Sequence, residues 1–222
     1  MKIFSGVALV SLVAVSSASG GELLTNGGFE TGTFAGWTAY TQAGGLGIIF
    51  ASNTLAGGAL PVSGSPAAGP TGGDWYAAVD QGGAGAYSLS QDFTISPDAT
   101  SVVVSFDMFH SDLSGTAPLN SGVLDYSLGP AQWARVDILD AFGASLIAIA
   151  DVGSQPWTTY VVDITGLVTP GSTYTFRYGH VDNQFFYHTA LDNASVVDNS
   201  IPAPGAAALL GLAGCVARRR RR

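Results

Sequence analysis

Residues 23–37 read LLTNGGFETGTFAGW, and this stretch decides how the fold is interpreted. Its glycines predict a turn-rich corner, because glycine adopts backbone conformations that other residues avoid. Phe29 and Trp37 are its largest apolar side chains, and we expect them to anchor the corner in a core. Residues 22–24, where the corner begins, predict a short strand. The chain therefore opens as compact β structure.

Short segments rich in β-branched and aromatic residues recur after this corner, with turn residues between them. We expect strands at 37–40, 47–52, 75–79, 87–95, 101–110, 134–140, 145–150, 159–164, 174–180 and 190–197. No stretch between the two ends of the chain keeps a 3.6-residue apolar period. The sequence predicts one all-β domain over 21–200. Two long irregular segments, 56–73 and 111–132, are of the kind that carry binding sites.

The corner is similar to the opening of galactose-binding-like jelly-roll domains, which include several families of carbohydrate-binding modules. The matching pattern is Leu-Leu-x-Asn-Gly-Gly-Phe-Glu-x-Gly followed by Gly-Trp, and residues 191–196 resemble the closing strand. The resemblance implies a jelly-roll β-sandwich. It also implies that Glu30 and Asp192 bind a structural Ca²⁺, whose preferred ligands are carboxylate and carbonyl oxygens. The alternative is that both carboxylates accept hydrogen bonds from turn N–H groups.

The N-terminal segment has the layout of a secretory signal. Met1-Lys2 is basic, residues 7–15 are apolar, and residues 16–18 are small, so we expect a signal helix over 1–20 with cleavage near residues 18–20. Export would place the body of the protein outside the cytoplasm.

The C-terminal segment 201–222 predicts a sorting signal. Its apolar run, 206–217, would reach about 18 Å as a helix, which is short of the roughly 30 Å hydrocarbon core of a bilayer. The arginines that follow would stay cytoplasmic. The residues that form this signal are Pro202, Ala203, Pro204, Arg218, Arg219 and Arg220.

This tail resembles the PEP-CTERM signal of bacteria that make extracellular polysaccharide. The resemblance implies transient membrane insertion of the C-terminal helix and processing by an exosortase-type membrane enzyme. The family's central glutamate is replaced by Ala203 here. The alternative is an ordinary transmembrane helix that stays as a tail anchor.

Charge and cysteine content exclude several classes of protein. The chain has eight Lys and Arg against sixteen Asp and Glu, but the body between the two signals keeps only Arg135 and Arg177 as cations. Two minus sixteen gives it a charge of −14, which repels nucleic acid and anionic lipid. The one cysteine, Cys215, lies in the tail, so the body has neither a disulfide nor a thiolate metal site.

Residues 92–112 and 163–182 form a weak internal repeat, in which Asp-x-Thr is followed by Phe-x-x-x-His-x-Asp. We expect each to form a β-hairpin. His110 with Asp112, and His180 with Asp182, would share a strand face and could offer two ligands each to a transition metal. The competing and preferred interpretation makes the histidine the polar end of a core stripe, hydrogen-bonded to a nearby carboxylate or carbonyl.

No catalytic motif is evident, so an enzyme is not expected. The carboxylates are scattered singly, and no Gly-x-Ser-x-Gly elbow or Ser-His-Asp arrangement occurs. Aromatic rings near the two long segments are instead candidates for stacking on sugars. These rings are Trp75, Tyr76, Trp133 and Tyr187. We assign Trp37, Trp157 and Phe106 to the core because of their positions in the apolar alternation.

The sequence thus predicts an exported cell-surface or matrix protein with a non-catalytic glycan-binding β-sandwich. Its expected partners are a processing exosortase and a polysaccharide, with no nucleic acid. Two alternatives remain, which are a purely structural surface protein without a discrete ligand and a glycoside-active enzyme.

Overall fold

The computed structural model describes residues 19–200 as an all-β structure. The expected signal helix and sorting helix lie outside the described residues. The strands are β1 (Ser19–Glu22), β2 (Thr38–Thr41), β3 (Gly47–Ser52), β4 (Tyr76–Gln81), β5 (Gly85–Thr94), β6 (Ala99–Asp112), β7 (Gln132–Leu139), β8 (Ser145–Ile149), β9 (Gln155–Asp163), β10 (Thr173–Asp182) and β11 (Tyr187–Ser200), with one 3-10 turn, η1 (Thr165–Leu167).

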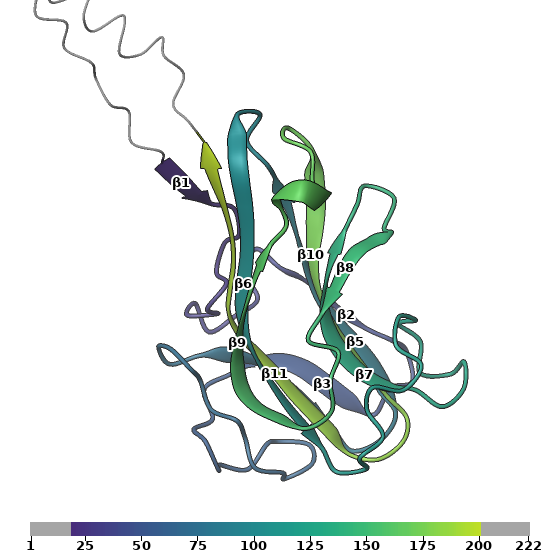
Figure 1. The fold of residues 1–222 in the computed structure, drawn as a ribbon. Coiled ribbons are helices and arrows are strands. Elements are labelled where there is room, and N and C mark those ends of the chain that lie inside the picture. The colour runs from purple at the N-terminus through teal and green to yellow at the C-terminus, as the bar shows by residue number, and fades with distance from the viewer. Residues whose placement is uncertain (1–18, 201–222) are drawn as a thin grey trace, which may run out of the picture.

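Two antiparallel sheets face each other as a β-sandwich (Figure 1). The six-stranded sheet has the order β3-β4-β11-β6-β9, with β1 added alongside β11, and the five-stranded sheet has the order β2-β5-β10-β7-β8. The predicted all-β sandwich is confirmed. In the described part of the chain, no helix is long and apolar enough to cross a membrane.

Each of the ten expected strands after the corner is present, with ends that differ by a few residues. The short first strand lies earlier than expected, at Ser19–Glu22 in place of 22–24, and it pairs with residues 197–200 of β11. The sheet therefore begins two residues before the domain boundary that the sequence suggests. Cleavage after Ala18, within the expected range, would leave this strand whole.

The two repeated segments are not the hairpins that we expected. β5 and β6 lie in different sheets, and so do β9 and β10, so each segment crosses from one sheet to the other. The crossings lie side by side, because the Ile95 N–H donates to Ser172 O at 3.1 Å and the Gly171 N–H donates to Ile95 O at 3.0 Å. The repeat reflects the side-chain alternation that both crossings share.

The corner at residues 23–37 closes one end of the core. Gly27 is required there, because a Cβ on this residue would lie 1.7 Å from Ala194 O, and Ala194 N–H donates to Gly27 O at 3.0 Å. Phe29 packs on Trp37 with ring centroids 5.5 Å apart, and Trp37 meets Phe176 edge to face at 5.6 Å. The opening stretch is thus fixed against the last strand and the centre of the core.

Inward-facing residues of both sheets form one large apolar core, which includes Trp37 and Phe106 as predicted. Two smaller apolar clusters lie on the outward faces of the sheets. The segment after β3 covers Tyr76, Ala78 and Ala190, and Trp157 packs at the edge of that cluster. The segment before β7 covers Trp133, with Leu124 packed against it. Each long irregular segment therefore folds back over a sheet face.

We predict that Trp133→Ala destabilises the domain by about 3–5 kcal/mol, because it empties a fully buried site beneath the segment that covers it. Urea denaturation measures the loss. Phe142→Ala is the matched control, since Phe142 is 94% exposed at the turn between β7 and β8, and it should shift stability by less than about 0.5 kcal/mol. Equal unfolding midpoints for both variants would contradict the burial of Trp133.

Candidate functional site

The structure corrects the expected platform of sugar-stacking rings. Tyr76, Trp133 and Tyr187 are fully buried, and a buried ring has no face to offer a ligand. The sequence argument assumed that a ring on the outward side of a strand meets solvent, whereas the long segments cover Tyr76 and Trp133. Tyr187 points into the main core. Trp75 is partly buried and packs against the same core.

Both His-x-Asp histidines are core residues held by β11. His110 Nδ1 lies 2.6 Å from Tyr187 Oη, and His180 Nδ1 lies 2.8 Å from Thr189 Oγ1. Burial lowers the pKa of His110 to about 4 and, aided by the other two histidines, the pKa of His180 to about 3. Both rings are therefore neutral at pH 7. The structure confirms that both histidines are hydrogen-bonded core residues, but their partners are hydroxyl groups in place of the expected carboxylate or carbonyl.

A cleft opens at the end of the sandwich where β4 turns into β5 and β10 turns into β11. It has a volume of about 290 Å³. Its lining residues are Gln81, Gly82, Gly83, Ala84, Asp182, Asn183, Gln184, Phe185 and Phe186. This volume is near the lower end of the range for small-molecule sites, so the cleft can take about one sugar ring or one substituent. A long run of polymer would not fit inside it.

The floor of the cleft is polar and buried. The Gln81 Nε2 amide donates to Asp182 Oδ2, and the Gln184 N–H donates to Asp182 Oδ1 at 2.8 Å. Gln81 Oε1 has no hydrogen-bond partner among the residues that the structure describes. Burial raises the pKa of Asp182 to about 6, and the charge of Asp112 adds to this shift. Gln81 is fully buried and Asp182 is 3% exposed, so the polar side chains of the lining that an entering group can reach are those of Asn183 and Gln184.

Asp112, the partner of Asp182 in the internal repeat, organises the neighbouring loop. Its Oδ1 accepts from the Ser114 N–H at 2.9 Å and from Gln132 Nε2 at 2.9 Å, and its Oδ2 accepts from the Ala117 N–H at 2.8 Å. Gln132 is also paired with Asp182 across β7 and β10. One polar layer thus closes the core at this end and supports the cleft.

The wall of the cleft carries an exposed ring that the sequence did not single out. Phe185 is 55% exposed, and its ring centroid lies 4.8 Å from that of Phe186 in an edge-to-face contact. The run of adjacent rings at 185–188 was the available signal, because consecutive strand residues point to opposite faces. Tyr187 was assigned to the surface, but it is Phe185, in the turn before β11, that meets solvent.

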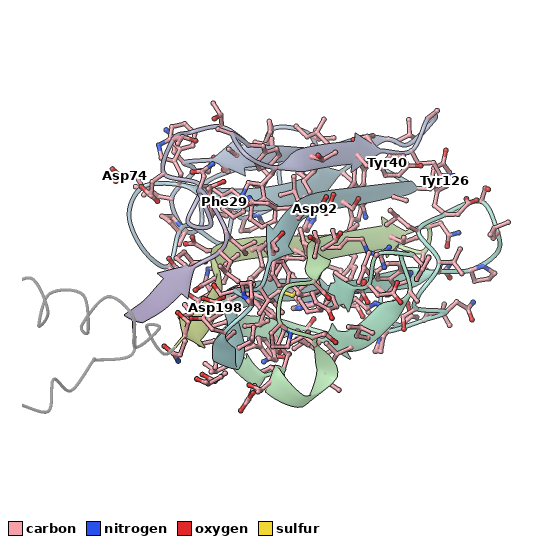
Figure 2. The ribbon with its side chains drawn as sticks, turned by 90° about the horizontal axis from the view of Figure 1, so that it is seen from above. Phe29, Tyr40, Asp74, Asp92, Tyr126 and Asp198 are labelled. Carbon is pink, nitrogen blue, oxygen red and sulfur yellow. The ribbon has the colours of Figure 1, made fainter. Side chains whose placement is uncertain are left out.

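A second polar cluster lies at the end of the sandwich opposite the cleft. Figure 2 shows Asp74 and Phe29 at that end, away from Tyr40 and Tyr126. Glu30 accepts from the N–H groups of Asp74 at 3.0 Å and Trp75 at 3.1 Å. Asp192 Oδ2 accepts from the Thr71 N–H at 2.9 Å, and burial raises the pKa of Asp192. Both carboxylates thus accept turn N–H groups, as the hydrogen-bond alternative predicts.

Asp107 joins this cluster, and the sequence did not indicate it. It lies directly opposite Asp192 in the β6–β11 pairing. Thr71 Oγ1 is 2.8 Å from Asp107 Oδ2 and 2.9 Å from Asp192 Oδ2. One hydroxyl proton cannot serve both carboxylates, and like charges directly opposite destabilise a sheet. Asn193 Nδ2 also donates to Asp107 Oδ2 at 2.7 Å. No group of three or more His, Cys, Asp or Glu suited to a metal occurs in residues 19–200.

Glu30 lies near the same place. A Cβ on Gly28 would lie 3.8 Å from Glu30 Cγ and 3.9 Å from Asp192 Oδ1, so the two side chains flank this glycine. Gly73 passes even closer, with its own Cβ position 2.3 Å from the Glu30 carboxylate carbon. The structure therefore brings the two carboxylates that the sequence singled out into one corner.

Comparison with known proteins supports the fold. No family model matches the chain, and no curated protein matches it. Among solved structures, TmCBM61 in complex with β-1,4-galactotriose superposes with a TM-score of 0.53 at 12% identity, over 79% of this chain and 97% of that one. This chain has the β-sandwich fold of carbohydrate-binding modules.

A second solved structure shares the sandwich. A Stig cyclase from Fischerella sp. TAU superposes with a TM-score of 0.54 at 16% identity, over 82% of this chain and 99% of the cyclase. The likeness to TmCBM61 and to the cyclase establishes a shared fold alone.

We predict that Asp182→Asn stabilises the protein at pH 8 by about 3 kcal/mol and has little effect at pH 4. A carboxyl whose pKa is raised to about 6 by burial favours the folded state while it is protonated, and this contribution is lost as pH rises from about 4 to above 6. Asparagine does not titrate, so it avoids that loss. Denaturant unfolding of both proteins at several pH values measures the difference, and a difference independent of pH would contradict the raised pKa.

Proposed function

We propose that this chain is an exported, non-catalytic carbohydrate-binding protein, and that the cleft formed by residues 81–84 and 182–186 holds the glycan. The observation that carries the proposal is the combination of an exposed ring and an exposed amide in one cleft. Phe185 can stack on the apolar face of a sugar, while the exposed side chain of Gln184, which also lines the cleft, can hydrogen-bond to its hydroxyl groups. The fold shared with carbohydrate-binding modules supports the same function.

Charge favours a neutral or cationic glycan. The two arginines of the described residues both pair with Asp137, Arg135 at 2.9 Å and Arg177 at 2.6 Å, and Arg135 also lies over the ring of Trp133. Neither arginine lines the cleft. An acidic sugar would therefore meet Asp182 without a cation to offset its charge.

The lining also favours binding over catalysis. Glycoside hydrolysis commonly uses two carboxylates on either side of the bond, about 5–10 Å apart. Asp182 is the one carboxylate among the described residues that line the cleft. The other two classes stay as alternatives to be tested, since a structural surface protein would bind no discrete glycan and a glycoside-active enzyme would release products from one.

We predict that Phe185→Ala weakens glycan binding by about 1–3 kcal/mol, because it removes the exposed ring of the cleft, and leaves the melting temperature nearly unchanged. A glycan array identifies a ligand for the full chain, and calorimetric titration compares the variants on it. Phe142→Ala removes an equally large exposed ring that does not line the cleft. This variant should bind like the wild type. Equal affinity of all three proteins would contradict the assignment of the cleft.

We also propose that the protein reaches the cell surface through removal of both terminal signals, the first by cleavage near residues 18–20 and the second, residues 201–222, by an exosortase-type enzyme. The basic and apolar order of each signal supports this, and both signals lie almost wholly outside the described residues. The intact mass of protein recovered from native cell surfaces is expected to lack Arg218–Arg222. A mass that still includes these arginines would rule out the processing step.

We further propose that Ca²⁺ stabilises the corner, where Glu30 and Asp192 would supply carboxylate oxygens together with backbone carbonyls. Calcium at 1,000 times its dissociation constant would add about 4 kcal/mol to stability. For a domain of this size we expect a melting temperature about 10 °C lower in excess chelator. The shift should be absent in Glu30→Gln. A wild-type melting temperature that does not respond to chelator would remove the proposal.

A further inference from the structure

The glutamine at the start of β7 meets two hydroxyl groups of the loop that precedes this strand. Thr116 Oγ1 lies 2.6 Å from the side-chain oxygen Oε1 of Gln132, and Ser114 Oγ lies 2.8 Å from the same atom. Because a C=O bond is about 1.23 Å long, the Thr116 oxygen is at most about 3.8 Å from the carbonyl carbon Cδ of Gln132. An alcohol oxygen and a carboxamide carbon are therefore near the separation from which such groups react.

A carboxylate lies behind the two hydroxyl groups. Ser114 Oγ donates to Asp112 Oδ1 at 2.7 Å, and it is also 2.7 Å from Thr116 Oγ1. Each hydroxyl group carries one proton. When Ser114 donates to Asp112 and Thr116 donates to Ser114, neither proton is left for Gln132 Oε1. The Thr116 oxygen then faces the carboxamide with a lone pair, as a nucleophile does when a base activates it.

The same carboxylate holds the nitrogen that a nucleophile would displace. Gln132 Nε2 donates to Asp112 Oδ1 at 2.9 Å, so the amide nitrogen and the chain of hydroxyl groups meet at one oxygen atom. Burial acts to raise the pKa of this carboxylate, but hydrogen bonds from Ala117, Ser114 and Gly115 outweigh burial and lower the pKa. The charged form therefore prevails at pH 7 and can take up a proton.

Elsewhere in residues 19–200, two further glutamine side chains meet a threonine hydroxyl group without such a carboxylate. Thr25 Oγ1 is 3.2 Å from Gln91 Oε1, and Thr158 Oγ1 accepts from Gln155 Nε2 at 2.7 Å. Neither amide forms a hydrogen bond to a carboxylate in this part of the chain. The full set of nucleophile, carboxamide and base therefore distinguishes Gln132 from these two.

We propose that Thr116 and Gln132 form an intramolecular ester, which joins the long loop covalently to β7. The bond from Thr116 Oγ1 to Gln132 Cδ forms while the bond from Cδ to Nε2 breaks. The hydroxyl proton passes through Ser114 to Asp112 and then to the departing nitrogen, which leaves as ammonia. Nothing is oxidised or reduced, and dilution of the ammonia draws the exchange forward. Full burial of Gln132 keeps water, the competing nucleophile, away from the carbonyl carbon.

Such a link suits a domain that has no disulfide. Cys215, in the tail, is the one cysteine of the chain. The loop that the ester closes covers Trp133, and its carbonyl groups at Tyr126 and Gly129 accept from the Asn183 side chain beside the cleft. A covalent closure restricts the unfolded chain and so stabilises the folded state. The inference does not depend on what the cleft binds.

The test is mass spectrometry of the full chain after storage at neutral pH, both intact and after chymotryptic digestion. We expect a mass lower by one ammonia than the sequence of the recovered chain gives. The peptides that contain Thr116 and Gln132 should stay joined although the chain is cut after Tyr126. Hydroxylamine, which cleaves esters, should separate the joined peptides. Unlinked peptides would overturn the proposal, whether Gln132 is intact or has become glutamate, and a link that resists hydroxylamine would overturn its assignment as an ester.

Variants assign the roles of the two hydroxyl groups. Thr116→Val removes the attacking oxygen and nearly keeps the shape of the side chain, so the link should be absent. Thr158→Val is the matched control, because it removes the hydroxyl group beside Gln155, and it should keep the link. Ser114→Ala interrupts the proton path and should slow formation of the link in freshly made protein by about a hundredfold or more. Melting curves confirm that each variant is folded. A link that survives Thr116→Val, or that forms at the wild-type rate in Ser114→Ala, would contradict these roles.

Discussion

The pairing of β11 with its neighbours is the constraint on which the rest of the structure depends. This strand runs from Tyr187 to Ser200 and pairs with β6 along almost its whole length, while β4 and β1 pair with parts of its other edge. Its inward residues Tyr187 and Thr189 hold the two core histidines. Asp192, near the centre of this strand, belongs to the polar cluster that also contains Glu30 and Asp107. One strand therefore connects the two ends of the sandwich at which we place the two candidate sites.

The same strand also holds the cleft apart from the cluster formed by Glu30, Asp107 and Asp192. The cleft lies where β11 begins, beside the turn that carries Phe185, and the corner lies near its middle, where the opening stretch crosses it. A register shift in the β6–β11 pairing follows Asp192, next to Asn193, which has a positive φ of 50°. The bulge bends the strand at the point where the backbone of Ala194 contacts Gly27 in the opening stretch.

Burial of polar groups is the second organising feature of the structure. Asp112, Gln132, Gln81 and Asp182 close the end of the core through hydrogen bonds to one another and to loop backbone. Such a layer is stable only where nearly every member has a partner. Within this layer, Gln81 Oε1 is the acceptor without a partner among the described residues. The layer closes the core directly beneath the cleft, which Gln81 and Asp182 also line.

The sequence by itself determined the all-β class and nearly all strand positions, because strand periodicity and glycine turns are local properties. It could not determine which outward faces meet solvent. That depends on the two long segments, whose Ala-, Gly- and Ser-rich sequences carry no periodicity, and they cover Tyr76 and Trp133. The cleft likewise arises from residues about a hundred positions apart, Gln81 and Asp182, that meet only when two sheets are stacked. Local chemistry predicts elements, whereas the packing of layers decides which side chains remain available to a ligand.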